Sequence, residues 1–175
     1  MNDVAPRQAV LVVIGLGSNI QPRENLLRGF AALSEALDLV DASRVYETEP
    51  VDAPGAPAFL NAAVVARSAR TPAELKALFR GIEARLGRVR DPENKSAPRQ
   101  IDIDLLMYGD EVVRDADGDL LVPHPDIERH AYVARPLADL DLDLVHPLSG
   151  RDLREVAANF AEAEGIRPSD LELPL

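Results

Sequence analysis

The chain contains no cysteine and no tryptophan, and only two of its 175 residues are lysine, at positions 76 and 95. The absence of cysteine excludes disulfides, thiolate metal sites and cysteine nucleophiles, and it suits a reducing cytosol. Neither lysine follows a glycine-rich phosphate loop, which excludes the Walker mode of nucleotide binding. Aromatic residues make up 4% of the chain against 46% hydrophobic residues overall. The core is therefore predicted to consist of leucine, valine, alanine and isoleucine.

Positive charge and long apolar runs are also scarce. The chain has 19 Lys and Arg against 30 Asp and Glu, a net charge of −11 with a pI near 4.7, which argues against non-specific nucleic-acid binding. The polar residues 1–8 precede only a short apolar run, Ala9–Ile14, of strand length rather than membrane-span length. We expect a soluble cytoplasmic protein with one domain, a core at about 8–145 and a C-terminal helical extension at about 146–175.

Two aspartates, Asp102 and Asp104, alternate with Ile101, Ile103 and Leu105. This period predicts a β-strand with both carboxylates on one face, with Cα atoms about 6.5–7 Å apart. Like charges this close repel, and Mg²⁺, which takes oxygen ligands, would compensate for the repulsion. The alternative is an edge strand whose solvated face is acidic. The alternation alone leaves both interpretations open.

A cluster of basic residues stands immediately before these aspartates, although the chain as a whole is acidic. Its members are Arg85, Arg88, Arg90, Lys95 and Arg99. Guanidinium groups bind phosphate oxygens in a planar fork, while carboxylates hold the cation that bridges the phosphates. The combination favours binding of a metal-bound polyphosphate over a charged loop in which arginines and aspartates only pair with each other.

Apolar periodicity predicts the order strand–helix–strand–strand–helix–strand, followed by a hairpin and further helices. Strands are expected at 8–16, 39–48, 59–67 and 101–105, and helices at 22–39, 72–86, 131–140 and 152–163. Thr71 and Glu74 form a capping box before the second helix, and Gly87 is expected to end it. We interpret Gly15–Asn19 as a strand-to-helix turn rather than a phosphate-binding loop. The order is that of an α+β, ferredoxin-like βαββαβ fold, one antiparallel sheet with helices packed on it, plus C-terminal helical additions.

Two polar residues remain ambiguous at this point. Asn61 is the one amide in an otherwise apolar strand, so it is either a satisfied structural group or a ligand contact. His124 lies between two prolines and is either a solvent-facing loop histidine or a donor to a phosphate.

Several short motifs combine into a more specific pattern. They are Gly17-Ser18-Asn19, SRVYETEP at 43–50, FLNAA at 59–63, GRVR at 87–90, PRQIDID at 98–104 and VPH at 122–124. In this order and spacing the chain resembles the hydroxymethyl-dihydropterin pyrophosphokinase family of folate biosynthesis.

This resemblance implies transfer of the terminal diphosphate of ATP to the hydroxymethyl oxygen of 6-hydroxymethyl-7,8-dihydropterin, with release of AMP. It implies Asp102 and Asp104 as ligands of two Mg²⁺ ions, and as catalytic residues together with Arg88 and Arg99. The implied nucleotide-binding residues are Glu83, Arg88, Arg90, Arg99, Ile103 and His124. The implied pterin-binding residues are Thr48, Pro50, Val51, Phe59, Asn61 and Tyr132, with the two aromatic rings enclosing the pterin. The implied partners are small-molecule substrates, without nucleic acid or membrane, and a monomer is plausible.

Two departures from the family pattern stand out. Members commonly have a tryptophan in the loop where this chain reads Lys95-Ser96-Ala97, and an arginine where this chain has His130. The competing hypotheses are another two-metal phosphoryl or nucleotidyl transferase and a non-catalytic nucleotide-binding domain. The pair Phe59 and Asn61 with Tyr132 argues against the first, and the intact aspartates and arginines argue against the second.

Overall fold

The chain folds around one antiparallel sheet whose strands differ in length. The computed structural model describes residues 7–49, 57–89, 97–140, 142–160 and 165–175. Its strands are β1 (Val10–Ser18), β2 (Asp38–Ala42), β3 (Tyr46–Thr48), β4 (Phe59–Ser68), β5 (Asp102–Tyr108) and β8 (Ile166–Pro168). The order is β5-β1-β4-β3-β8, and β2 also pairs with β4. The long apolar strands β1 and β4 therefore lie at the centre, and the aspartate strand β5 lies beside β1.

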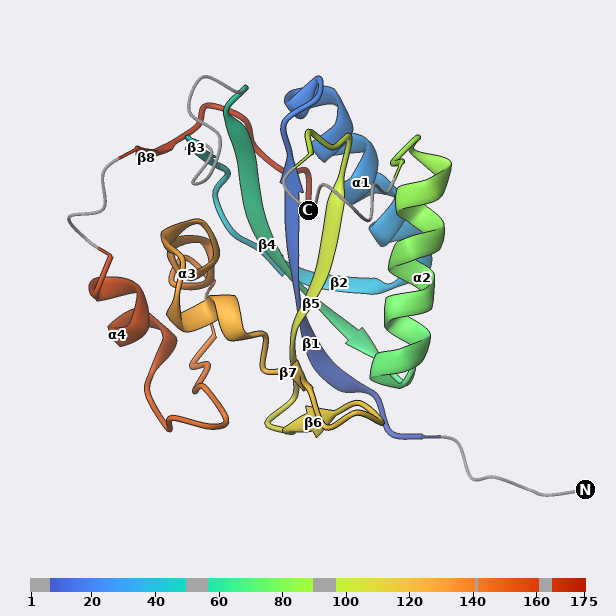
Figure 1. Ribbon diagram of the computed structural model, residues 1–175, viewed down its shortest axis with the longest axis vertical. Helices are drawn as coiled ribbons and strands as arrows, with labels where there is room; N and C mark the ends of the chain where they lie inside the picture. Colours follow the sequence, from blue (N-terminus) through green and yellow to red (C-terminus); the bar gives the residue numbers. More distant parts are fainter. Residues whose placement is uncertain (1–6, 50–56, 90–96, 141, 161–164) are drawn as a thin grey trace, which may run out of the picture.

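Two long helices, α1 (Pro22–Ala36) and α2 (Pro72–Arg85), cover one face of the sheet (Figure 1). In α1, Leu26, Phe30 and Leu33 recur at helical spacing and are buried in the larger core, as the sequence predicts. The predicted capping box of α2 is present, because Thr71 accepts from the Glu74 amide while the Glu74 side chain accepts from Thr71. The apolar stripes of both helices thus hold the sheet from one side.

The opposite face carries a second, smaller core. It is covered by α3 (Ala131–Leu137) and α4 (Leu153–Ala158), which lie on the other side of the sheet from α1 and α2 in Figure 1. A 3₁₀ helix, η1 (Pro125–Glu128), precedes α3, and the predicted hairpin is present as β6 (Val113–Arg114) and β7 (Leu120–Val122). Leu153, Val156 and Ala157 of α4 are buried. This helix is therefore part of the second core.

The ferredoxin-like arrangement predicted from the sequence is confirmed, and its differences in detail have local causes. The segment predicted as one strand at 39–48 forms two, β2 and β3, because Ser43 between them binds Ala63 of β4 through both its main chain and its hydroxyl. The strand predicted to end at Leu16 continues through Gly17 and Ser18, so the turn begins only at Asn19. Strand β8 was not predicted from its three residues. Within the described ranges, none of the helices combines the length and apolarity needed to cross a bilayer.

Candidate active site

The two aspartates of β5 lie on one face of the sheet, as their spacing predicts. Ile103 and Leu105 between and beyond them belong to the core under α1 and α2, so Asp102 and Asp104 project from the opposite face. In the ladder with β1, Asp102 pairs with Gly17 and Asp104 with Gly15. Both carboxylates therefore stand next to positions of β1 that carry no side chain.

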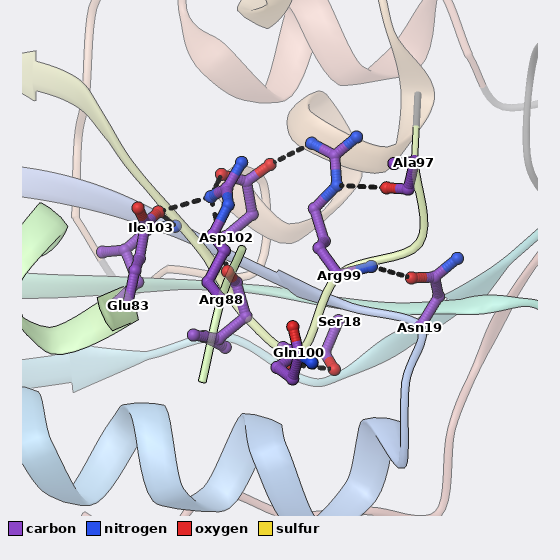
Figure 2. A network of polar contacts seen from close by, with 10 residues as sticks. Ser18, Asn19, Glu83, Arg88, Ala97, Arg99, Gln100, Asp102 and Ile103 are labelled. Atoms are coloured by element: carbon purple, nitrogen blue, oxygen red, sulfur yellow. Dashed lines mark hydrogen bonds and ion pairs between the residues drawn. The ribbon is translucent and has the colours of Figure 1, made fainter. Parts of the chain in front are cut away.

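Asp102 is the centre of a compact ionic cluster (Figure 2). One of its oxygens accepts a hydrogen bond from Arg88, and the other accepts from Arg99 Nη1 at 2.5 Å. Arg88 Nη1 also donates to Glu83 Oε1 at 2.5 Å, and the same Glu83 oxygen accepts the main-chain N–H of Ile103 at 2.9 Å. Glu83 is only 1% exposed. The cluster thus ties the end of α2 to β5 through Arg88.

The electrostatics of the two aspartates differ because their partners differ. Burial opposes the ionisation of Asp102, but the charges and hydrogen bonds of Arg88 and Arg99 outweigh it and lower its pKa. For Asp104, enclosure by surrounding protein and the negative charges of Asp102 and Glu83 raise the pKa to about 7. Asp104 is nevertheless exposed to solvent. Asp104 is therefore a carboxylate that a cation reaching it from solvent would stabilise.

The donor set fits Mg²⁺ rather than a metal held by protein ligands alone. No group of three or more histidine, aspartate or glutamate side chains arranged for a metal occurs among the described residues. A pair of carboxylates on one strand face is enough for Mg²⁺, which commonly takes one or two carboxylates together with substrate phosphates and water. Asp104 meets this requirement as it stands, because the neighbouring negative charges raise its pKa to about 7 and a cation would offset them. Each oxygen of Asp102 already accepts from an arginine, so Asp102 would hold a cation only by sharing or exchanging these partners.

Gly17 separates the aspartate strand from Asn61 on the other side of β1. It pairs with Asp102 of β5 and with Asn61 of β4. A Cβ at Gly17 would lie 3.0 Å from Asn61 Oδ1 and 3.9 Å from the Asp102 Cβ. Gly17 is itself buried, so the Asn61 oxygen packs over its Cα where a side chain would otherwise lie.

The stability effect of this contact can be tested by replacing Gly17, which has it, and Gly81, which does not, by alanine. We expect Gly17→Ala to lower the free energy of unfolding by about 1–2 kcal/mol, because the added methyl overpacks a rigid sheet position. A Cβ at Gly81, in α2, would meet no heavy atom of the described residues within 4 Å. Gly81→Ala should instead raise the free energy of unfolding by about 0.5–1 kcal/mol through helix propensity. Urea denaturation of both variants measures the difference, and equal effects would contradict the contact.

The side chain of Asn61 is held in one orientation. Its Nδ2 donates to Thr48 Oγ1 at 2.8 Å, and both residues are buried. Its Oδ1 is then the atom that lies close to Gly17. Phe59, two residues before Asn61 on β4, lies under the guanidinium of Arg99, with 5.9 Å between Cζ and the ring centroid. Arg99 therefore lies between the aspartates and the aromatic residue.

Residues of η1 and α3 border the same region. The His124 side chain accepts the Asp126 main-chain N–H at 3.3 Å, and burial lowers the pKa of His124. His130 stacks on Tyr132 with ring centroids 5.0 Å apart, and its Nε2 lies 3.7 Å from Asp126 Oδ1. Burial, followed by the charges of Asp126, Asp104 and Asp102, raises the pKa of Tyr132 to about 12. The Tyr132 hydroxyl is thus within the electrostatic field of the aspartate pair.

The structure brings many of the predicted site residues together, but not all of them can be placed. Pro50, Val51 and Arg90 lie outside the described residues. The Ile103 side chain faces the core, so any nucleotide contact it makes would come from its main chain. Arg88 and Glu83 line a hollow of about 370 Å³ together with Arg80 and Ala84. This hollow extends from the ionic cluster along α2.

Sequence reasoning missed three residues of this region. The sequence favours a turn at Ser18 and Asn19, yet both are buried. Ser18 donates to the Gln100 carbonyl, and Asn19 accepts the Arg99 main-chain N–H. Asp126 was given no role, although it lies within 4 Å of His124 and His130 side-chain nitrogens. The signal for the first two was their place in the Gly17-Ser18-Asn19 motif. For Asp126 the only signal was its position two residues after His124.

Comparison with known proteins points to one family. The family profile described as 7,8-dihydro-6-hydroxymethylpterin-pyrophosphokinase (HPPK) matches residues 13–142. The chain is 34% identical over 145 residues to the 2-amino-4-hydroxy-6-hydroxymethyldihydropteridine pyrophosphokinase of Aquifex aeolicus, covering 82% of this chain and 88% of that protein. It is 38% identical over 150 residues to the protein of the same description from Methylorubrum extorquens, covering 84% and 91%.

A solved structure agrees at the level of the fold. The crystal structure of Plasmodium falciparum HPPK-DHPS A437G with pteroate superposes with a TM-score of 0.71 over 93% of this chain, at 13% identity. This chain covers 47% of that longer one. The match therefore supports the architecture of the sheet and its helices.

Proposed function

Because the chain belongs to the 7,8-dihydro-6-hydroxymethylpterin-pyrophosphokinase family, we propose that it uses ATP and Mg²⁺ to convert 6-hydroxymethyl-7,8-dihydropterin into its diphosphate. It is a pyrophosphokinase of folate biosynthesis. In this reaction the hydroxymethyl oxygen attacks the β-phosphorus of ATP and loses its proton. The bond from that phosphorus to the oxygen bridging to the α-phosphate breaks, and AMP leaves.

The observation that carries the assignment of the site is the convergence on Asp102. Two arginines from different segments and a second carboxylate, Asp104, meet on the sheet face next to Asn61. Phosphoryl transfer needs little covalent chemistry from a protein, and it depends on positioning and on neutralising the charge of the polyphosphate. Four charged groups held together on one sheet face meet both needs.

In this proposal Asp102 and Asp104 hold Mg²⁺, two ions per site. When bound, Mg²⁺ would supply positive charge that offsets the negative charge of the polyphosphate during transfer. Arg88 and Arg99 contact the transferred phosphates, since a guanidinium can exchange a carboxylate partner for a phosphate of similar geometry. Glu83 holds Arg88 from behind. Arg90, the main chain of Ile103 and His124 complete the proposed nucleotide contacts.

The pterin is proposed to bind beside Asn61, on the β4 side of Gly17. Asn61 presents its Oδ1 there, and the hydrogen bond to Thr48 holds the amide in that orientation. A pterin carries N–H donors along one edge, and a fixed amide oxygen is a suitable acceptor for them. Phe59 and Tyr132 are proposed to enclose its flat ring, with main-chain groups near Pro50 and Val51 assisting. Stacking on aromatic rings suits a planar heterocycle.

A product assay tests this function directly. The purified chain is mixed with ATP, Mg²⁺ and 6-hydroxymethyl-7,8-dihydropterin, and the nucleotide products are separated. AMP formed in equal amount to pterin diphosphate is the expected result. Formation of ADP or inorganic diphosphate would indicate a different phosphoryl or nucleotidyl transferase, and no product in the presence of ATP binding would indicate a non-catalytic nucleotide-binding domain.

Asn61→Ala tests the pterin side separately. We expect the KM for the pterin to rise by about 10- to 100-fold, because a buried site that has lost a hydrogen-bond partner discriminates strongly. The KM for ATP should change by less than about threefold, since Asn61 lies across β1 from the aspartates. Steady-state kinetics with each substrate varied in turn measures both values. Equal losses for the two substrates would contradict the pocket assignment.

A further inference from the structure

Ser18 and Asn19 are buried polar residues that the proposed chemistry does not use. Ser18 is 0% exposed and Asn19 is 3% exposed, which is unusual for side chains of this type at the end of a strand. Both point toward the segment that precedes β5 (Figure 2). The segment in question, Ala97–Gln100, carries Arg99.

The regular ladder between β1 and β5 ends before it reaches Arg99. The last pair is Gly17 with Asp102, whereas β1 continues to pair with β4 as far as Ser18 and Leu60. Residues 97–100, which precede Asp102 in the chain, lie outside any strand. Without other partners, this stretch would have no fixed position relative to the sheet.

Asn19 supplies those partners. The Arg99 main-chain N–H donates to Asn19 Oδ1 at 2.7 Å, and the Arg99 carbonyl accepts from the main-chain N–H groups of Asn19 and Ile20, both at 3.2 Å. Ser18 Oγ donates to the neighbouring Gln100 carbonyl at 2.5 Å. The Asn19 side chain thus takes the place of a strand residue, and both main-chain polar groups of Arg99 are satisfied by it and its neighbour.

The position of the Arg99 backbone decides where its guanidinium can be. The side chain is long and has several rotatable bonds, yet its Nη1 contacts Asp102 at 2.5 Å while its Cζ lies over the Phe59 ring. Both contacts require a fixed Cα, since a shift of the backbone moves the guanidinium by a similar distance. A displacement of about 1 Å at a catalytic group can cost about 100-fold in rate.

We propose that Asn19 is a positioning residue for Arg99: its side-chain carbonyl fixes the Arg99 backbone so that the guanidinium reaches the polyphosphate. This inference rests on the proposed function. Asn19 itself is assigned no substrate contact. Its Oδ1 acts through the hydrogen bond to the Arg99 main-chain N–H, while its Nδ2 makes a longer hydrogen bond, 3.5 Å, to the Pro57 carbonyl. The effect of losing it should therefore depend on whether the Arg99 guanidinium is present.

A double-mutant cycle tests this dependence. The rate of AMP formation is measured for Asn19→Ala, Arg99→Ala and the double variant. We expect kcat/KM for ATP to fall about 10- to 100-fold for Asn19→Ala and about 1,000-fold for Arg99→Ala. The double variant should lie within about threefold of Arg99→Ala, because no positioned guanidinium remains to be misplaced.

Ser43→Ala is the matched control. Ser43 is also buried, and its hydroxyl also bridges main-chain groups, accepting from the Ala63 N–H at 2.9 Å and donating to the Arg44 carbonyl at 2.7 Å. These partners belong to β4 and to the connection between β2 and β3, not to the segment that carries Arg99. Any loss of activity in Ser43→Ala should multiply with that of Arg99→Ala, as expected for a purely structural position.

Asn19→Asp keeps the inference testable if the alanine variant does not fold. It retains an oxygen acceptor for the Arg99 N–H, so we expect at least about fivefold more activity than in Asn19→Ala. If the alanine variant does not fold, we expect the aspartate variant to be folded and active. The inference would be overturned if the activity losses of Asn19→Ala and Arg99→Ala multiply in the double variant, or if Asn19→Ala keeps full activity. It would also be overturned if the aspartate variant is as inactive as the alanine variant. A parent protein that forms no AMP would instead overturn the proposed function itself.

Discussion

Replacing Asp104 by asparagine is expected to abolish AMP formation and, at the same time, to stabilise the ligand-free protein. The carboxylate is proposed to hold Mg²⁺, and an amide is a much weaker ligand for a hard cation, so we expect a loss of at least about 1,000-fold in kcat/KM. The gain in stability has a separate origin. In the absence of a cation, Asp104 faces the negative charges of Asp102, Glu83 and Asp126.

The sign of the stability effect follows from the raised pKa. The pKa of Asp104 is about 7 in the folded protein and 3.8 when unperturbed, so between these values the folded state binds more protons than the unfolded state. Stability is therefore lost as the pH rises from about 3.8 to about 7. Above pH 7 the ionised Asp104 lowers the free energy of unfolding by its full amount. Because the group is exposed on one side, solvent screening reduces this cost to about 1–2 kcal/mol.

Thermal and urea unfolding at several pH values measure the gain. Asp104→Asn should be more stable than the parent at pH 8, and the difference should shrink toward pH 5. Added Mg²⁺ should stabilise the parent but not the variant. Asp110→Asn, in the exposed turn just beyond β5, is the matched control and should leave stability and activity unchanged. An active Asp104→Asn enzyme would refute the metal assignment, and a less stable one would refute the account of the pKa.

The second large effect is expected for Arg88→Ala. Arg88 is the shared partner of two carboxylates whose side chains are 2% and 20% exposed, Glu83 and Asp102. Removing one partner of a buried ion pair leaves uncompensated charge and costs about 3–5 kcal/mol. We therefore expect the free energy of unfolding to fall by this amount, together with a loss of activity, because the same guanidinium is proposed to contact the phosphates.

Two further variants separate the buried charge from other causes. Arg88→Ala combined with Glu83→Gln should recover part of the lost stability, since the amide keeps an oxygen for the Ile103 N–H without the charge. Arg44→Ala removes an arginine that pairs with Asp139 but whose side chain is 64% exposed, and it should cost less than about 1 kcal/mol. Urea denaturation measures all three. Similar losses for Arg44→Ala and Arg88→Ala would contradict the argument from burial.

Much of the fold could be predicted because local patterns and tertiary structure agree. The alternation around Asp102 and Asp104, the helical spacing of Leu26, Phe30 and Leu33, and the capping box at Thr71 each specify an element by short-range physics. The capping residues placed the start of α2 at the correct position. Strand β8 could not be predicted, because its three residues are ordered only by pairing with β3, far away in the sequence.

The charged residues of the candidate site could be named from the sequence, but their contacts with one another could not. The spacing of Asp102 and Asp104 fixed their common face, whereas no sequence pattern indicates that Arg88 binds both Asp102 and Glu83. Such partners are set by how α2 docks against β5. Asn19 was missed for the same reason, since its role depends on a segment 80 residues away.

The stacking of Arg99 on Phe59 has a consequence for how the two substrates affect each other. On the proposed assignments, the guanidinium covers a ring face that the flat substrate would use, and the polyphosphate is the ligand that would draw it away. Each substrate would then remove an obstacle to the other, which is heterotropic cooperativity. Linkage requires this gain to be reciprocal, so an inhibitor shaped like the pterin should bind more tightly in the presence of nucleotide than alone.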